Sequence, residues 1–375
     1  AMTQFESTDI FCRVIDNFGD AGVCWRLARR FLALGVKRIR FITDHPEVLA
    51  KLAPDAEKLA RVIPWDSFAL EAGKPDFEPA DLVIETFGCR LPESYDEALA
   101  EKRARAIATG LKPPFYFNLD YLSAEDWVEE SHNITGLHPR LDLPKLWFFP
   151  GFTERTGGLL IEDDYEAARQ SFMPGKKDFL ASLNADPERA ALFVFCYPVN
   201  RVETLAKGLA LSDKPWNVLI APGEAGDRLE GLLKTIGAEG NRIRAVRTPF
   251  LPQTEFDRLL WASDAGIIRG EDSFVRAQLA GLPFLWSTYP TEDHAHRVKL
   301  DAWLDKFVPV LPESLADRYR KTSVEWLEGE LSPEGFRDFL EFAPTLRPSL
   351  LEWQKKLLSR GDLTRHMLQR AQSAL

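Results

Sequence analysis

The sequence predicts an α/β protein with two domains, each built around a parallel sheet of the Rossmann type. Short apolar, β-prone runs alternate with amphipathic stretches at helical spacing. This alternation breaks once near the middle of the chain and then resumes. A chain of 375 residues also exceeds the size at which one hydrophobic core usually stops growing. Two domains of ordinary size are therefore expected.

The first domain is expected over residues 1–160. Its opening strand reads DIFCRVI and leads into the helix VCWRLARRFLALG, which Gly35 ends and which carries Arg26, Arg29 and Arg30 opposite its apolar face. The later strands of this domain read KRIRFIT, DLVIETFG and PPFYFNLDYL. Strands that alternate with helices indicate a parallel sheet covered on both faces.

The alternation breaks over residues 144–177, which are rich in Pro and Gly and predict a loop and linker. The second domain is expected over residues 178–354. Its helix TEFDRLLWA is expected to begin at Thr254, with Asp257 three residues on as in a capping box. The last residues, about 355–375, are amphipathic and are expected to form a helix that crosses back to the first domain.

Composition excludes several classes of protein. A net charge of −10 argues against a nucleic-acid binder. Without a C-x-x-C pair, the four cysteines are expected to be buried, reduced thiols of a cytoplasmic protein. The six histidines form no metal-binding pattern. No apolar run is long enough for a membrane span or a signal peptide, so neither is expected.

The most specific pattern in the second domain is PQTEFDRLLWASDAGIIRGEDSFVRAQLAGLPFLW. Asp272 and Ser273 are expected to cap a new helix, whose first N–H groups and positive dipole end suit a pyrophosphate. Glu271 is placed to accept hydrogen bonds from ribose or sugar hydroxyls. Tyr197, together with Phe195, is placed to stack on a base. A plain helix cap and two core aromatic residues would also explain these positions.

The turn VIDNFGDAG, residues 14–22, stands where dinucleotide-binding proteins carry the phosphate loop G-x-G-x-x-G. This turn carries the carboxylates of Asp16 and Asp20 instead, which predicts that it receives a cation. An ordinary turn or cap would explain one aspartate, but two at the carboxyl end of the first strand favour a site. A diphosphate pocket in one domain and carboxylates in the other predict a two-domain glycosyltransferase of the GT-B type, its domains facing across a cleft. The chain has no D-x-D-type metal motif, so a metal-independent reaction without cofactors is expected.

Three segments, FCRVIDNFGDAGVCWRLARR, FFPGFTERTGGLL and RGEDSFVRAQLAGLPFLW, resemble in order the protein-arginine rhamnosyltransferases that modify bacterial elongation factor P. The resemblance implies dTDP-β-L-rhamnose as donor, an arginine of elongation factor P as acceptor, and inversion at the anomeric carbon. It implies no role for nucleic acid or membranes.

Residue by residue, the resemblance implies that Asp20 is the general base, that Asp16 is a second required carboxylate, and that Glu271 is a further acid needed for activity. The loop implied to lie against the donor comprises Asn17, Phe18 and Gly19. The donor site implied in the second domain comprises Tyr197, Gln253, Arg269, Gly270, Glu271, Asp272 and Ser273.

Other interpretations remain open at this point. A GT-B enzyme with another nucleotide sugar or a hydroxyl acceptor would share the fold, although such enzymes often use a histidine base and residues 14–22 contain none. A non-catalytic nucleotide-binding module is a second alternative. A dehydrogenase is disfavoured because no G-x-G-x-x-G follows any candidate strand.

Overall fold

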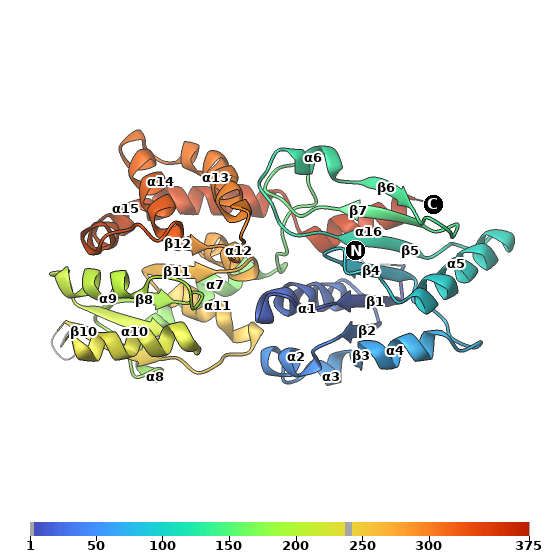
Figure 1. Ribbon diagram of the computed structural model, residues 1–375, viewed down its shortest axis with the longest axis horizontal. Coiled ribbons are helices and arrows are strands. Elements are labelled where there is room, and N and C mark those ends of the chain that lie inside the picture. Colours follow the sequence, from blue (N-terminus) through green and yellow to red (C-terminus); the bar gives the residue numbers. More distant parts are fainter. Residues whose placement is uncertain (1–3, 237–241, 375) are drawn as a thin grey trace. The chain divides into compact units, whose positions relative to one another are not determined.

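The computed structural model describes residues 4–236 and 242–374. The chain divides into two compact units (Figure 1). Unit 1 comprises Ala1–Asp163 and Arg360–Leu375, and unit 2 comprises Asp164–Ser359. Both units are α/β, as predicted, and each has its own sheet.

The sheet of unit 1 has seven strands in the order β3-β2-β1-β4-β5-β7-β6, and only the edge strand β6 runs antiparallel to its neighbour. Its strands are β1 (Ser7–Cys12), β2 (Arg38–Thr43), β3 (Arg61–Pro64), β4 (Leu82–Thr86), β5 (Phe115–Leu119), β6 (Ile134–Leu137) and β7 (Pro144–Phe148). The chain runs outward from β1 to β3 and then returns to the other side of β1 for β4. Ligands of such sheets bind outside the carboxyl ends of the strands at this switch point, here between β1 and β4.

Helices cover both faces of this sheet because alternate strand residues point to opposite sides. Ile10 and Phe41 pack in the core under α1 and α16, whereas Phe11 and Val83 pack in a second core under α4 and α5. The helices of unit 1 are α1 (Asn17–Ala33), α2 (Pro46–Leu52), α3 (Ala56–Leu59), α4 (Trp65–Ala72), α5 (Glu93–Ala108), α6 (Trp127–Ser131) and α16 (Leu363–Ser373).

Unit 2 has a five-stranded parallel sheet in the order β10-β9-β8-β11-β12, with its switch point between β8 and β11. Its strands are β8 (Ala190–Val194), β9 (Trp216–Ile220), β10 (Ile243–Arg247), β11 (Ala265–Arg269) and β12 (Phe284–Ser287). Its helices are α7 (Tyr165–Phe172), η1 (Met173–Gly175), α8 (Lys176–Ser182), α9 (Val202–Leu211), α10 (Glu224–Thr235), α11 (Gln253–Ala262), α12 (Asp272–Leu279), α13 (Ala295–Phe307), η2 (Val308–Val310), α14 (Glu313–Leu327) and α15 (Pro333–Ser359).

Two predictions are wrong: that residues 144–177 form only a loop and linker, and that the last residues form one continuous helix. Residues 144–177 are not a plain linker, because they contain β7, α7 and η1; the Tyr165 hydroxyl accepts a hydrogen bond from the Trp261 indole at 2.9 Å, which fixes α7 on α11. The last helix is also interrupted. α15 ends at Ser359 and α16 begins at Leu363, because Gly361 takes a left-handed φ of 83° that ends a helix.

The arginine face of α1 is covered in the folded protein. Arg26 pairs with Glu162 at 2.7 Å, and Arg30 pairs with Asp362 at 3.0 Å. The second pair is buried, with side-chain exposures of 3% and 4%. Asp362 also accepts a hydrogen bond from the backbone N–H of Arg365, and this bond caps α16. It accepts another from the backbone N–H of Ile161. One carboxylate therefore ties the C-terminal helix to α1.

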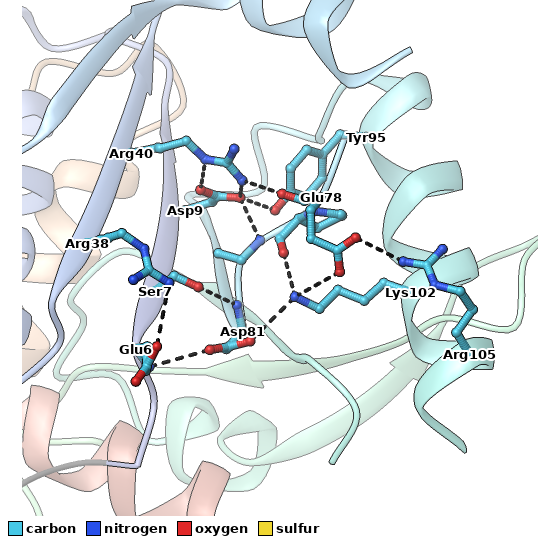
Figure 2. A network of polar contacts seen from close by, with 12 residues as sticks. Glu6, Ser7, Asp9, Arg38, Arg40, Glu78, Asp81, Tyr95, Lys102 and Arg105 are labelled. Carbon is cyan, nitrogen blue, oxygen red and sulfur yellow. Dashed lines mark hydrogen bonds and ion pairs between the residues drawn. The ribbon is translucent and has the colours of Figure 1, made fainter. Parts of the chain in front are cut away.

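The amino ends of the unit 1 strands are closed by a second polar network (Figure 2). The buried carboxylate of Asp9 accepts two hydrogen bonds from the Arg40 guanidinium at 2.6 and 2.7 Å, one from the Tyr95 hydroxyl, and one from the Ala80 N–H at 3.0 Å. These contacts join β1, β2 and α5. Hydrogen bonds to the Asp9 carboxylate thus connect the elements at the amino edge of the sheet.

All four cysteines are free thiols, and three of them are buried. In the part of the chain that the structure describes, no helix is both long and apolar enough to cross a bilayer.

Replacing Asp362 with Asn should destabilise unit 1 by about 3 kcal/mol, because it removes the buried counter-charge of Arg30. Urea denaturation measures this loss as a lower free energy of unfolding. Asp163→Asn is the matched control: Asp163 also pairs with Arg30, at 3.1 Å, but its side chain is half exposed. Its loss should cost less than about 1 kcal/mol. Equal losses in the two variants would contradict this account of how α16 is held.

Candidate functional site

The turn that follows β1 lies at the switch point of the unit 1 sheet. Asp16 is the N-cap residue of α1, and Asp20 lies in the first turn of that helix. Both carboxylates therefore come from residues that precede or begin one helix, at the carboxyl end of the central strand. The structure brings Asp16, Phe18, Gly19 and Asp20 together here. The side chain of Asn17 lies outside what the structure describes.

Asp20 is the most deeply buried acid of this turn, with 3% of its surface exposed. Its Oδ2 atom accepts hydrogen bonds from the backbone N–H groups of Ile15 at 2.8 Å and Asp16 at 3.0 Å. The Tyr121 hydroxyl also hydrogen-bonds the carboxylate. Burial raises the pKa of Asp20, the three hydrogen bonds lower it, and the nearby Asp44 raises it, with a net shift above the ordinary value. A carboxylate in this setting is a better proton acceptor than an exposed one.

Gly19 makes room for the second carboxylate. A Cβ atom at position 19 would lie 2.7 Å from Oδ2 of Asp16, closer than such contacts are found. The backbone N–H of Gly19 donates to the Asp16 carbonyl at 2.6 Å, which closes the turn. The Asp16 carboxylate consequently lies over a residue that has no side chain.

The predicted donor residues of unit 2 gather at the carboxyl ends of β8 and β11. Arg269, at the end of β11, lies over the rings of Phe195 at 4.4 Å and Tyr197 at 4.9 Å, and it donates to the Cys196 carbonyl. Gln253 is the first residue of α11 and is buried. Phe256, one turn further along α11, contacts the Phe195 ring with centroids 6.2 Å apart. A cation, aromatic faces and a buried amide thus share one end of the sheet.

The loop between β11 and α12 is held by an aromatic stack. Gly270 takes a φ of 76°, and its carbonyl accepts a hydrogen bond from the Trp286 indole at 2.8 Å. The Trp286 ring stacks on Phe274 of α12, with centroids 3.6 Å apart and planes within 5°. The glycine conformation and this stack fix where α12 begins.

The expected capping of that helix is wrong in detail. α12 begins at Asp272 with Glu271 as its N-cap residue, and no side chain caps it, so neither Asp272 nor Ser273 acts as the predicted cap. All three side chains are partly exposed. The start of α12 still favours an anion. The N–H groups in the first turn of a helix have no carbonyl partner within the helix, and this end of the helix carries a positive partial charge.

The predicted capping box of α11 is also wrong. The helix begins at Gln253 after the N-cap residue Pro252. Asp257 instead accepts two hydrogen bonds from the fully buried guanidinium of Arg276 in α12, at 3.0 and 2.8 Å. This pair anchors α12 to α11, one turn beyond Ser273.

The sequence did not indicate Tyr121, Trp286 or Arg276 as contributors to these sites. Arg276 and Trp286 lie inside the quoted motif of the second domain, but no spacing rule predicts which residues they contact. Tyr121 acts on Asp20, about a hundred residues away in the chain. A weak signal existed for Tyr121, because a polar aromatic residue directly after a buried strand stands at the carboxyl edge of the sheet.

Comparison with solved structures identifies the fold. An EarP structure, described as the basis for EarP-mediated arginine glycosylation of translation elongation factor EF-P, aligns with a TM-score of 0.60 at 24% identity, covering 98% of this chain and 99% of that one. A UDP-glucosyltransferase from Polygonum tinctorium aligns with a TM-score of 0.51 at 13% identity and covers 99% of both chains. The fold is that of the GT-B glycosyltransferases.

The family follows from sequence. The family model described as "Elongation-Factor P (EF-P) rhamnosyltransferase EarP" matches residues 8–372. A protein-arginine rhamnosyltransferase of Pseudomonas aeruginosa is 34% identical over 97% of this chain and 98% of its own length. This chain belongs to the EarP family of glycosyltransferases, and the predicted family resemblance is confirmed.

Replacing Gly19 with Ala should reduce glycosyl transfer about ten- to a hundredfold, because a displacement of about 1 Å in a reacting group has effects of this size. The new methyl group meets the end of the Asp16 side chain, which moves more easily than backbone. The melting temperature should hold or rise, because alanine favours a helix by about 1 kcal/mol.

Gly231→Ala provides the control for the Gly19 variant, since Gly231 also lies in a helix and its Cβ would meet no atom within 4 Å. Glycosyl transfer rates measured on both variants test whether the position of the Asp16 carboxylate affects activity. Full activity in Gly19→Ala would show that the position of the Asp16 carboxylate does not matter.

Proposed function

We propose that this enzyme transfers L-rhamnose from dTDP-β-L-rhamnose to an arginine side chain of elongation factor P, with Asp20 as the general base. One observation carries the proposal: two carboxylates, one of them buried and restrained by hydrogen bonds, occupy the turn at the switch point of the unit 1 sheet. The family match supports the sugar and the protein acceptor. The fold supports transfer from a nucleotide sugar.

An arginine acceptor explains why the turn is acidic. A guanidinium has a pKa above about 12, so it arrives protonated and is a poor nucleophile. Paired carboxylates hold it in a fork and orient one nitrogen. As the new C–N bond forms, the attacking nitrogen becomes acidic, and a carboxylate within about 3 Å can take its proton.

The proposed reaction is a single displacement. The nitrogen attacks the anomeric carbon, the bond from that carbon to the diphosphate oxygen breaks, Asp20 receives the proton, and dTDP leaves. Attack opposite the leaving group inverts the anomeric centre and gives an α-linked product. Negative charge from Asp16 also favours the positive character that develops on the sugar.

The residues of unit 2 are assigned to the donor. The start of α12 at Asp272 and Ser273 receives the diphosphate, since both the N–H groups and the dipole of a helix start favour anions. Arg269 adds positive charge beside Tyr197 and Phe195, which offer faces for the base. Glu271 accepts hydrogen bonds from sugar hydroxyls, and Gln253 contributes a buried amide. No metal is assigned a role, and transfer is expected to continue in excess EDTA.

The direct test combines the purified chain with dTDP-β-L-rhamnose and elongation factor P. Mass spectrometry should find the increment of one deoxyhexose on a single arginine. Asp20→Asn should lower the transfer rate by about 10²- to 10⁴-fold, the range expected for loss of a general base. Donor affinity measured by calorimetry should change little.

Asp76→Asn is the control, because Asp76 is an exposed aspartate of the same unit, outside the turn. It should transfer at the normal rate. No increment despite confirmed donor binding would overturn the proposed reaction. Loss of donor binding in Asp20→Asn to the same degree as loss of transfer would make Asp20 a binding residue and remove it as the base.

A further inference from the structure

Tyr121 lies at the carboxyl edge of the unit 1 sheet, two residues beyond the end of β5. Strand β5 is the neighbour of β4, which is the neighbour of β1, so three consecutive strands end at this edge. The Tyr121 ring stacks on Phe87, with centroids 4.1 Å apart and planes within 10°. Phe87 follows β4 directly.

The partner of that stack is itself held in an uncommon conformation. Phe87 has a φ of 56° and Gly88 a φ of 65°, a left-handed pair that non-glycine residues seldom begin. The Phe87 N–H donates to the Leu119 carbonyl at 2.7 Å, and the Gly88 N–H donates to the Asn118 side chain at 3.0 Å. Both acceptors belong to β5. The loop after β4 is therefore fastened to β5, and it carries the ring on which Tyr121 rests.

The hydroxyl of Tyr121 reaches the Asp20 carboxylate. The two other hydrogen bonds to this carboxylate come from Ile15 and Asp16, which belong to the same turn as Asp20 and bind the same oxygen. Both N–H donors belong to the turn that carries Asp20, so they hold the carboxylate only relative to that turn. The Tyr121 hydroxyl comes from the segment that follows β5, so it ties the carboxylate to a second part of the sheet edge.

We propose that Tyr121 is a positioning residue for glycosyl transfer, which orients the Asp20 carboxylate. The proposal rests on the role of Asp20 as general base. Phe87 supports it by stacking on the Tyr121 ring, and neither aromatic residue is required to contact the substrates.

The expected pH dependence follows from the groups that surround Asp20. Burial and the Asp44 carboxylate raise the pKa of Asp20, whereas the N–H groups of Asp16 and Ile15 and the Tyr121 hydroxyl lower it. The Cys12 thiol also lies near Asp20. A base acts only when ionised, so activity is lost as the pH falls through its pKa. Removing the Tyr121 hydroxyl raises that pKa further and moves the acidic limb of the pH profile to higher pH.

The test is Tyr121→Phe, which removes the hydroxyl and retains the ring that stacks on Phe87. The rate constant kcat should fall about tenfold at pH 7, with KM for the donor unchanged within about twofold. The acidic limb should move up by about one pH unit, the size expected for one hydrogen bond to a charged group. An unchanged melting temperature shows that the fold is retained.

Tyr116→Phe is the matched control. Tyr116 lies on β5, the strand that precedes Tyr121, and donates its hydroxyl to another buried carboxylate, Glu85, at 3.0 Å. This variant should keep the normal kcat and pH profile. The proposal is overturned if Tyr121→Phe leaves both kcat and the acidic limb unchanged, or if Tyr116→Phe moves them equally.

The Asp20→Asn background separates the two claims. If Asp20→Asn abolishes transfer and Tyr121→Phe has no effect, only the positioning role fails. If Asp20→Asn transfers at the normal rate, the general-base assignment fails and the positioning role fails with it. If both roles hold, adding Tyr121→Phe to Asp20→Asn should cause no further loss, because the residue acts through Asp20.

Discussion

Burying a carboxylate at the end of a strand is unfavourable unless hydrogen-bond donors hold its charge, and the carboxyl edge of unit 1 is built around this constraint. Asp20 is almost fully buried and receives backbone N–H groups from its own turn and a hydroxyl from beyond β5. Gly19 leaves room for the Asp16 carboxylate beside it. The left-handed loop at Phe87 carries the ring on which Tyr121 stacks. The result is a carboxylate with raised pKa in a fixed place.

The site proposed in unit 2 has the opposite electrostatic requirement, because its proposed ligand is an anion. The proposed diphosphate needs positive charge, and the start of α12 and the Arg269 guanidinium offer it at the carboxyl ends of β11 and β8. Apolar contacts fix this arrangement, since Trp286 stacks on Phe274 and binds the Gly270 carbonyl. Both sheets have a switch point beside a central strand, between β1 and β4 in unit 1 and between β8 and β11 in unit 2, and each candidate loop lies at the carboxyl end of one of these strands.

The fold class could be predicted because the spacing of apolar residues along the sequence distinguishes strands from helices, and the two alternate. The pairs Asp16–Asp20 and Glu271–Asp272 could be singled out because each lies between an apolar strand and the first turn of the next helix. Local patterns misled where tertiary contacts override them: Asp257 resembled part of a cap but pairs with Arg276. Residues 144–177 resembled a linker because Pro and Gly obscure β7 and α7. Tyr121 had only the weak signal of its place after a buried strand, since its partner Asp20 lies about a hundred residues away in the chain and no spacing rule connects them.

The most direct test of the central claim is the ionisation of Asp20 in the intact protein. Carbon-13 NMR of labelled aspartate carboxylates, with the Asp20 signal assigned by its absence in Asp20→Asn, follows this group through a pH titration. The account predicts that Asp20 titrates at a higher pH than exposed aspartates and is ionised at neutral pH. A carboxyl group that is still protonated at neutral pH, or one that titrates like an exposed aspartate, would contradict it.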